Sequence, residues 1–131
     1  MKKQTLEKLP EAELDIMLCL WQHTQPVRTA QILAELSPQR GWTLSTLKVL
    51  LGRLVEKEFV QLTRDGRFTL YRAQVPESDY RRRETQNLMQ RYYKNSVKGM
   101  IAALVHDETL TGADLAEIEA LIREAGKKDA E

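Results

Sequence analysis

The chain has 131 residues and a net charge of +1; its 42% hydrophobic and 30% charged residues are typical of a soluble globular protein and exclude a disordered chain. It has no run of the roughly 18–20 apolar residues that a membrane span needs, and its start, MKKQTLEKLPEAE, lacks the apolar core of a signal peptide, so we expect a cytoplasmic protein without membrane insertion. A single cysteine, Cys19, excludes an internal disulfide and lies among apolar residues, which predicts a buried, inert thiol.

Two helices are predicted first. Residues 10–23 begin with Pro10 and repeat apolar residues at three- and four-residue spacing, which predicts a helix with a broad buried face. Pro26 interrupts this pattern, and Thr29 is expected to be the N-cap of a second, short helix. The serine, proline and glycine within residues 37–41 are expected to end that helix.

A third helix and a hairpin follow. The helix is predicted from an N-cap at Thr43 to about Glu58, because leucines recur on one face of it. Two runs rich in β-branched and aromatic residues, 59–64 and 67–73, flank an Asp65-Gly66 pair. Asp-Gly between such runs predicts a β-hairpin.

The last third of the chain is predicted to be helical. One long helix is expected over residues 79–105, polar in its first half and apolar along one stripe in its second half, and another helix is expected from Thr111. These apolar stripes are expected to pair across a two-fold axis. The predicted dimerisation residues are Tyr93, Val97, Met100, Ile101, Leu104, Leu115, Ile118, Leu121 and Ile122.

The order helix, helix, helix, hairpin predicts a winged helix-turn-helix, in which the third helix enters the major groove of DNA. The expected fold is therefore mainly α with a small β-hairpin wing. Residues 1–76 are expected to form the DNA-binding domain and residues 77–131 a helical dimerisation domain.

The outward face of the third helix carries no acidic residue in its first turns. Its residues are Ser45, Thr46, Lys48, Val49, Gly52 and Arg53. The hydroxyl groups can bond to bases or phosphates, Lys48 can reach a guanine edge or a phosphate, and Arg53 can grip a phosphate. A thymine methyl would give Val49 a partner, and Gly52 would let DNA approach the backbone. The alternative is an exposed helix with one stray valine.

Further basic residues lie at the predicted wing and in the charge pattern. Arg64 and Arg67 flank the hairpin turn, where phosphates or a minor groove could take them. Residues 1–73 carry 11 Lys and Arg against 8 Asp and Glu, whereas residues 106–131 carry 3 against 8. A basic N-terminal part and an acidic C-terminal part fit a DNA-binding domain joined to a domain that avoids phosphates. The alternative is a solvated surface whose charge asymmetry is accidental.

Enzymatic and metal chemistry are not indicated. The two histidines, His23 and His106, are distant in sequence, and the chain has no glycine-rich phosphate loop and no Cys/His ligand spacing. The run from His106 to Glu108 is interpreted as the polar end of a helix. We therefore expect no catalytic residue, no metal and no cofactor.

The chain resembles the penicillinase-repressor (BlaI/MecI/CopY-type) family of winged-helix transcriptional regulators. The resemblance covers nearly the whole chain. It rests on Leu9, Glu13, Met17, Leu20 and Trp21 in the first helix, on Trp42-Thr43, Thr46-Leu47-Lys48, Leu50-Leu51 and Arg53-Leu54 in the third, and on Lys57, Phe59, Val60 and Tyr71 beyond it.

This resemblance implies a homodimer that blocks transcription by binding a palindromic double-stranded DNA operator. Thr46, Lys48, Val49 and Arg53 would lie among the recognition-helix contacts, with Thr43 and Ser45 near the phosphates. The alternative function is protein–protein interaction, in which the winged helix binds a protein partner and does not read DNA directly.

Four departures from the family pattern stand out. Relatives commonly have threonine at the position of Val49 and glycine at that of Glu58. In β-lactam-responsive relatives, a membrane sensor-protease pathway leads to cleavage in the C-terminal domain; the matching bond here joins Ala103 and Leu104, and the surrounding residues differ. The cysteine cluster of copper-responsive relatives is missing from this tail.

Overall fold

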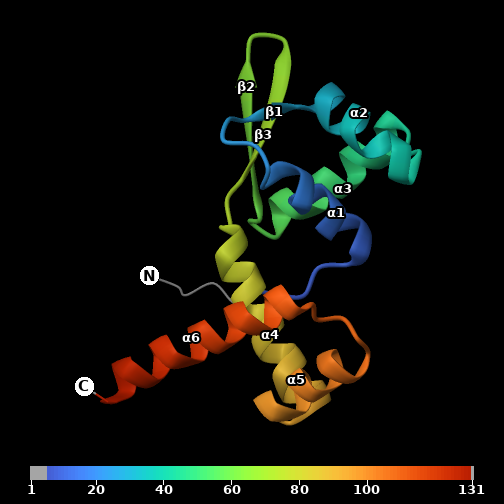
Figure 1. Cartoon of the computed structure of the whole chain (residues 1–131). Coiled ribbons are helices and arrows are strands. Elements are labelled where there is room, and N and C mark those ends of the chain that lie inside the picture. Colours follow the sequence, from blue (N-terminus) through green and yellow to red (C-terminus); the bar gives the residue numbers. More distant parts are fainter. Residues whose placement is uncertain (1–5, 131) are drawn as a thin grey trace. The chain divides into compact units, whose positions relative to one another are not determined.

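The computed structural model describes residues 6–130 and divides the chain into two compact units, Met1–Glu84 (unit 1) and Thr85–Glu131 (unit 2). In chain order, the elements are α1 (Glu11–Leu20), β1 (Val27–Arg28), α2 (Thr29–Arg40), α3 (Leu44–Glu56), β2 (Val60–Asp65), β3 (Phe68–Ala73), α4 (Glu77–Tyr93), α5 (Val97–His106) and α6 (Gly112–Ala130) (Figure 1). No helix among the described residues is both long and apolar enough to cross a membrane.

The helix α2 differs from the prediction at both ends. Thr29 is its first residue and not its N-cap; Arg28 occupies the cap position without a side-chain bond. Pro38 lies inside the helix, which continues for two more residues to Arg40. Gly41, with φ +61°, then caps the helix in the left-handed conformation that glycine adopts easily.

The helix α3 begins as predicted and ends earlier than predicted. The hydroxyl of Thr43 accepts a 3.2 Å hydrogen bond from the amide of Thr46, so Thr43 is the N-cap. At the other end, the amide of Phe59 donates to the carbonyl of Leu54 and the amide of Glu58 to that of Val55. This pair of bonds is a Schellman motif, with Glu58 in its left-handed position at φ +63°.

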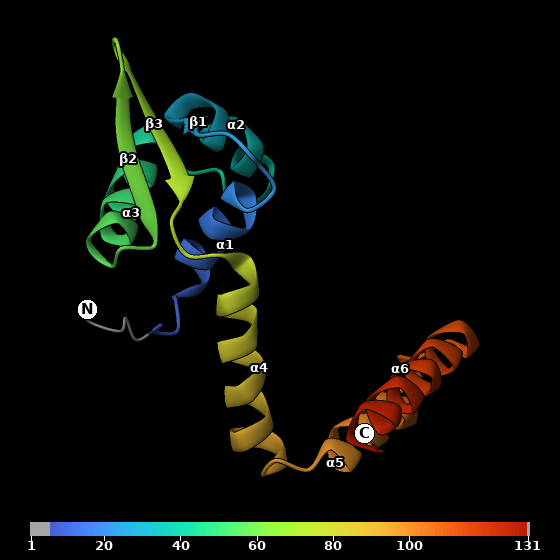
Figure 2. The ribbon, with the colours of Figure 1, turned by 90° about the vertical axis from the view of Figure 1, so that its left-hand side faces the viewer.

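A three-stranded antiparallel sheet forms the wing, in the order β1-β3-β2. Tyr71 of the central strand β3 pairs with Val27 of β1 on one side and with Leu62 of β2 on the other. The strand β1 was not predicted, because two residues after Pro26 carry too short a pattern. The hairpin turn lies at Gly66 and Arg67, one residue later than expected, and Gly66 takes the positive φ of +63°. Both views of unit 1 show the hairpin extending past α1, α2 and α3 (Figures 1 and 2).

One apolar core holds unit 1 together, made by α1, α2, α3 and the sheet. Its most deeply buried members are Ile16, Met17, Leu20, Ile32, Leu47, Leu51, Leu54, Phe59 and Val60. The start of α4 joins this core, because the ring of Tyr80 packs against Trp21 and Phe59 and its hydroxyl accepts a 2.9 Å bond from the amide of Leu9. The first turns of α4 are therefore part of unit 1.

The predicted continuous helix over residues 79–105 is wrong. α4 ends at Tyr93, and Lys94 and Asn95 take positive φ values of 47° and 66°. Asparagine tolerates this conformation, and Ser96 then caps α5 by accepting a 2.9 Å bond from the amide of Gly99. α6 begins where expected, with a reciprocal capping box between Thr111 and Asp114.

Unit 2 has almost no interior of its own. No residue of α5 is buried, and all of the apolar side chains described in α6 are exposed or only partly buried. The large exposed ones in unit 2 are Leu88, Tyr92, Val97, Val105, Leu115, Leu121 and Ile122. A helical unit with so little burial lacks the apolar stabilisation that an independent fold requires.

Candidate nucleic-acid interface

The predicted contact residues of α3 lie together on its exposed side. Leu47, Leu51 and Leu54 face the core with no exposed surface. On the other side are the exposed residues Ser45, Thr46, Lys48, Val49, Gly52 and Arg53. The Val49 side chain is 55% exposed, which leaves an apolar group in water on an otherwise polar face.

Gly52 lies on the same exposed face of α3 and has no side chain. A Cβ atom at this position would meet no heavy atom within 4 Å, so the packing of the chain itself does not require glycine there. Glycine in a helix interior costs about 1 kcal/mol relative to alanine. The surface beside Gly52 is therefore open.

A hollow of about 310 Å³ lies where α3, the start of α2 and the wing meet. Lys48 of α3 and Arg67 of the hairpin turn both line it, together with Arg28 of β1. Arg28 was not predicted as a functional residue. Its guanidinium carbon lies 3.8 Å from the ring centroid of Phe68, a cation–π contact that holds the charge beside the wing. This role was not predictable from the sequence, because Arg28 stands alone after Pro26 and belongs to no periodic pattern.

The four basic side chains predicted to contact DNA form no ion pair within the part of the chain that the structure describes. Among the described residues, no acidic group forms an ion pair with Lys48, Arg53, Arg64 or Arg67, whereas Arg40 pairs with Asp15 at 2.7 Å. Arg64 lies on β2 opposite Thr69, close to the turn that holds Arg67. These cations are available to phosphate groups.

One predicted position, Thr43, is already engaged within the chain. The Thr43 hydroxyl caps α3 and also donates to the Thr46 hydroxyl at 3.1 Å. Thr43 therefore stabilises the start of α3. On α4, which holds no predicted DNA-contact residue, the exposed Arg81 pairs with Glu77 at 3.3 Å.

The predicted dimerisation residues all fall in unit 2. Tyr93 ends α4; Val97, Met100, Ile101 and Leu104 lie on α5; and Leu115, Ile118, Leu121 and Ile122 lie on α6. Ala103 and Leu104, the candidate cleavage positions, are half-buried within α5.

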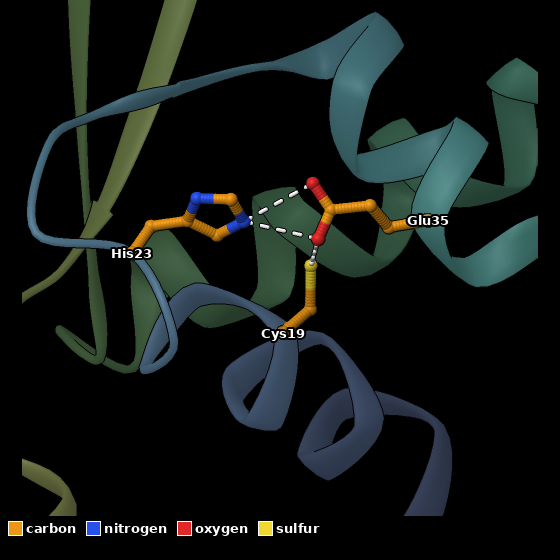
Figure 3. Close-up of side chains that lie close together, drawn as sticks. All are labelled: Cys19, His23 and Glu35. Carbon is orange, nitrogen blue, oxygen red and sulfur yellow. Dashed lines mark hydrogen bonds and ion pairs between the residues drawn. The ribbon is translucent and has the colours of Figure 1, made fainter.

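Three possible metal ligands come close together, the only such group of three or more among the described residues. They are Cys19, His23 and Glu35, whose ligand atoms lie within 4.8 Å of one another. The sequence did not indicate this cluster, because Glu35 comes from a different helix. Figure 3 shows the three side chains pointing toward one another from α1, the turn after it and α2.

Comparison with known proteins gives one consistent result. Residues 9–124 match the family model described as penicillinase repressor. A penicillinase repressor of Bacillus licheniformis is 27% identical over 124 residues, covering 95% of this chain and 94% of the relative. The methicillin resistance regulatory protein MecI of Mammaliicoccus sciuri is 25% identical over 122 residues, covering 93% of this chain and 98% of the relative.

One solved structure extends the comparison to three dimensions. The DNA-binding domain of the repressor BlaI in solution is 32% identical, with a TM-score of 0.51, and covers 61% of this chain and 94% of that one. The prediction of a mainly helical fold with a winged helix-turn-helix is confirmed.

Proposed function

The chain belongs to the penicillinase repressor family, and from this premise we propose that it represses transcription as a homodimer bound to a palindromic DNA operator. The family consists of DNA-binding regulators and not of enzymes. A signal that acts on the C-terminal part would release the repressor from DNA.

The observation that carries the proposal is the exposed face of α3. It holds Lys48 and Arg53 without acidic partners among the described residues, on a helix whose opposite side is fully buried. In a winged helix this third helix is the one that enters the major groove. Placed there, Lys48 would read a guanine edge and Val49 would contact a thymine methyl.

The remaining basic residues would position the protein. Arg53, Arg64 and Arg67 would bind phosphates, which supplies affinity but no sequence information. Ser45 and Thr43, at the start of α3, would lie near the DNA phosphates, because a helix N-terminus favours an anion. The absence of a side chain at Gly52 would let the DNA approach α3 closely.

Dimerisation would be the task of unit 2. Its exposed apolar side chains on α5 and α6 need a covering surface, and a second copy of the same unit supplies an identical one through a two-fold axis. Joining two winged units raises the effective concentration of the second half-site contact, so the dimer would bind far more tightly than one unit.

Release would follow from loosening the dimer. The bond between Ala103 and Leu104 lies within α5, so cutting it would divide the helix that carries much of the apolar surface. A membrane sensor-protease pathway is one partner that could make such a cut. Loss of unit 2 would reduce affinity without changing any base contact.

Selection from a random pool of DNA duplexes tests the proposal directly. The full chain should enrich a two-fold symmetric sequence, and its affinity should fall steeply as salt rises, because phosphate neutralisation releases counterions. A selection that enriches no sequence would contradict the repressor function.

The second candidate function is a winged helix that binds protein. The exposed apolar side chains of Val49, Leu62 and Phe68 favour it, because an apolar surface on the wing and α3 suits a protein partner. A chain that binds no DNA even at low salt would support this alternative.

A further inference from the structure

We propose that Cys19, His23 and Glu35 form a binding site for a zinc-type divalent metal ion that fastens α1 to α2. Neither the DNA-binding surface nor the dimer uses these residues. The site is independent of the proposed repressor function, and the experiments that test it need no DNA.

The three ligand atoms lie within 4.8 Å of one another, joined by direct hydrogen bonds. Nε2 of His23 lies 3.0 and 3.1 Å from the two carboxylate oxygens of Glu35, and Sγ of Cys19 lies 3.4 Å from Oε1 of Glu35. Ligand atoms of these types around a tetrahedral zinc ion are about 3.3–3.7 Å apart, given Zn–S, Zn–N and Zn–O bonds of about 2.0–2.3 Å, so the His23 and Glu35 atoms would separate by a few tenths of an ångström. Small side-chain adjustments would therefore admit the ion (Figure 3).

The set of donor atoms selects the class of metal. A thiolate, an imidazole and a carboxylate together suit Zn²⁺ or Co²⁺ and do not suit Mg²⁺ or Ca²⁺, which prefer oxygen ligands alone. Three protein ligands leave a fourth position for water. The His23 and Glu35 side chains are 26% and 35% exposed, so an ion can enter from solvent.

The surroundings orient the ligands. Glu35 also accepts a 3.0 Å bond from the side-chain amide of Gln31, one turn earlier on α2, which fixes its carboxylate toward α1. Outer contacts of this kind orient metal ligands in known sites. Cys19, by contrast, is only 7% exposed, so its sulfur is held by packing.

Binding would displace a proton, because a cysteine ligates a metal ion as the thiolate. On binding, the S–H bond breaks, the sulfur electron pair forms the S–metal bond and one proton leaves to solvent; Nε2 of His23 likewise binds through its lone pair.

The ion would also close a loop of the DNA-binding unit. His23 and Glu35 lie on either side of the segment that contains β1, and β1 carries Arg28 beside the hollow formed by Lys48 and Arg67. A link between α1 and α2 would hold the ends of this segment in place.

Cobalt titration of the untagged, chelator-treated full chain tests the site. One equivalent of Co²⁺ should give a thiolate-to-cobalt charge-transfer band and the intense visible bands of tetrahedral cobalt, and Zn²⁺ should remove both. Cys19→Ser should abolish the charge-transfer band, and His23→Gln and Glu35→Gln should each weaken cobalt binding at least about tenfold. His106→Gln is the matched control, since His106 is exposed on α5, and it should leave the titration unchanged.

Two results would overturn the proposal: no charge-transfer band at stoichiometric cobalt, or binding that His23→Gln and Glu35→Gln leave as strong as in the unaltered chain. Circular dichroism of each variant establishes that it folds. Should Cys19→Ser fail to fold, Glu35→Gln decides alone, because Glu35 is exposed on α2 and its replacement removes no core contact.

Discussion

The ammonium group of Lys57 lies 2.6 Å from Oε1 of Glu13, whose side chain is only 2% exposed. This ion pair connects α1 to the residue that caps the end of α3. It therefore holds the end of α3, the helix that carries the proposed DNA contacts, against α1. Both residues belong to the pattern on which the family resemblance rests.

Removing one partner should leave a buried charge. Lys57→Met is expected to lower the free energy of unfolding by about 3 kcal/mol, because Glu13 loses its counter-ion in the core. The double variant Glu13→Leu, Lys57→Met should recover most of this loss. Urea denaturation measures both, and Arg81→Met, which breaks an exposed pair, should cost less than about 1 kcal/mol. Equal losses of unfolding free energy for Lys57→Met and Arg81→Met would show that the buried ion pair stabilises the fold no more than the exposed one.

Glu58 occupies a backbone position that favours glycine, with φ +63° in the Schellman motif after α3. Both Glu58→Gly and Glu58→Ala remove the side chain, but only glycine relieves the left-handed strain. The glycine variant should therefore be more stable than the alanine variant by about 1 kcal/mol. Thermal denaturation compares them, and an alanine variant as stable as the glycine variant would exclude strain at this residue.

Cys19 should react slowly in the folded, metal-free chain. Its pKa of about 12 leaves almost no thiolate near neutral pH, since burial disfavours the charged form. At about pH 8, alkylation by iodoacetamide should be at least about a hundredfold slower in buffer than in denaturant, where the thiol has its ordinary pKa of about 8.5. Similar rates in the two conditions would contradict the buried, protonated thiol.

The exposed apolar side chains of α6 should hold the dimer together. Leu121→Asp places a charge where the side chain is 69% exposed in the single chain, so it should not disturb a core, but it should weaken the dimer strongly. Sedimentation velocity at micromolar concentration should show a dimer for the unaltered chain and a monomer for this variant. Leu62→Asp, on the wing, is the control of equal chemistry and should remain dimeric. A monomeric unaltered chain, or the same state for both variants, would contradict dimerisation through unit 2.

Local patterns were sufficient to predict α1, α2, α3 and the hairpin of unit 1. The leucine face of α3, the Thr43 cap and the two runs of the hairpin are signals that a few neighbouring residues carry, and the structure confirms them. The outward face of α3 followed from the same periodicity, because the residues between the buried leucines lie on the opposite side of the helix.

What the sequence did not reveal depends on contacts between distant residues. The two-residue strand β1 exists because β3 pairs with it, and Arg28 reaches the hollow through its contact with Phe68. The Cys19 cluster needs Glu35 from another helix. The break between α4 and α5 at Lys94 and Asn95 was missed because an apolar stripe continues across it in the sequence.

Wing residues and recognition-helix residues should differ in how their loss affects DNA binding. Arg67→Ala should weaken binding to every sequence about equally and reduce the salt dependence by about one phosphate contact, because a phosphate carries no sequence information. Lys48 should behave differently, since it is expected to reach a base edge.

The most direct measurement is therefore the affinity of the Lys48→Ala variant for the selected palindrome and for an unrelated duplex at one fixed salt concentration. If α3 reads the operator, the variant should lose about 10- to 100-fold on the palindrome and much less on the unrelated duplex, so that its specificity ratio falls. An unchanged ratio, with equal or no loss on both duplexes, would contradict sequence reading by this face of α3.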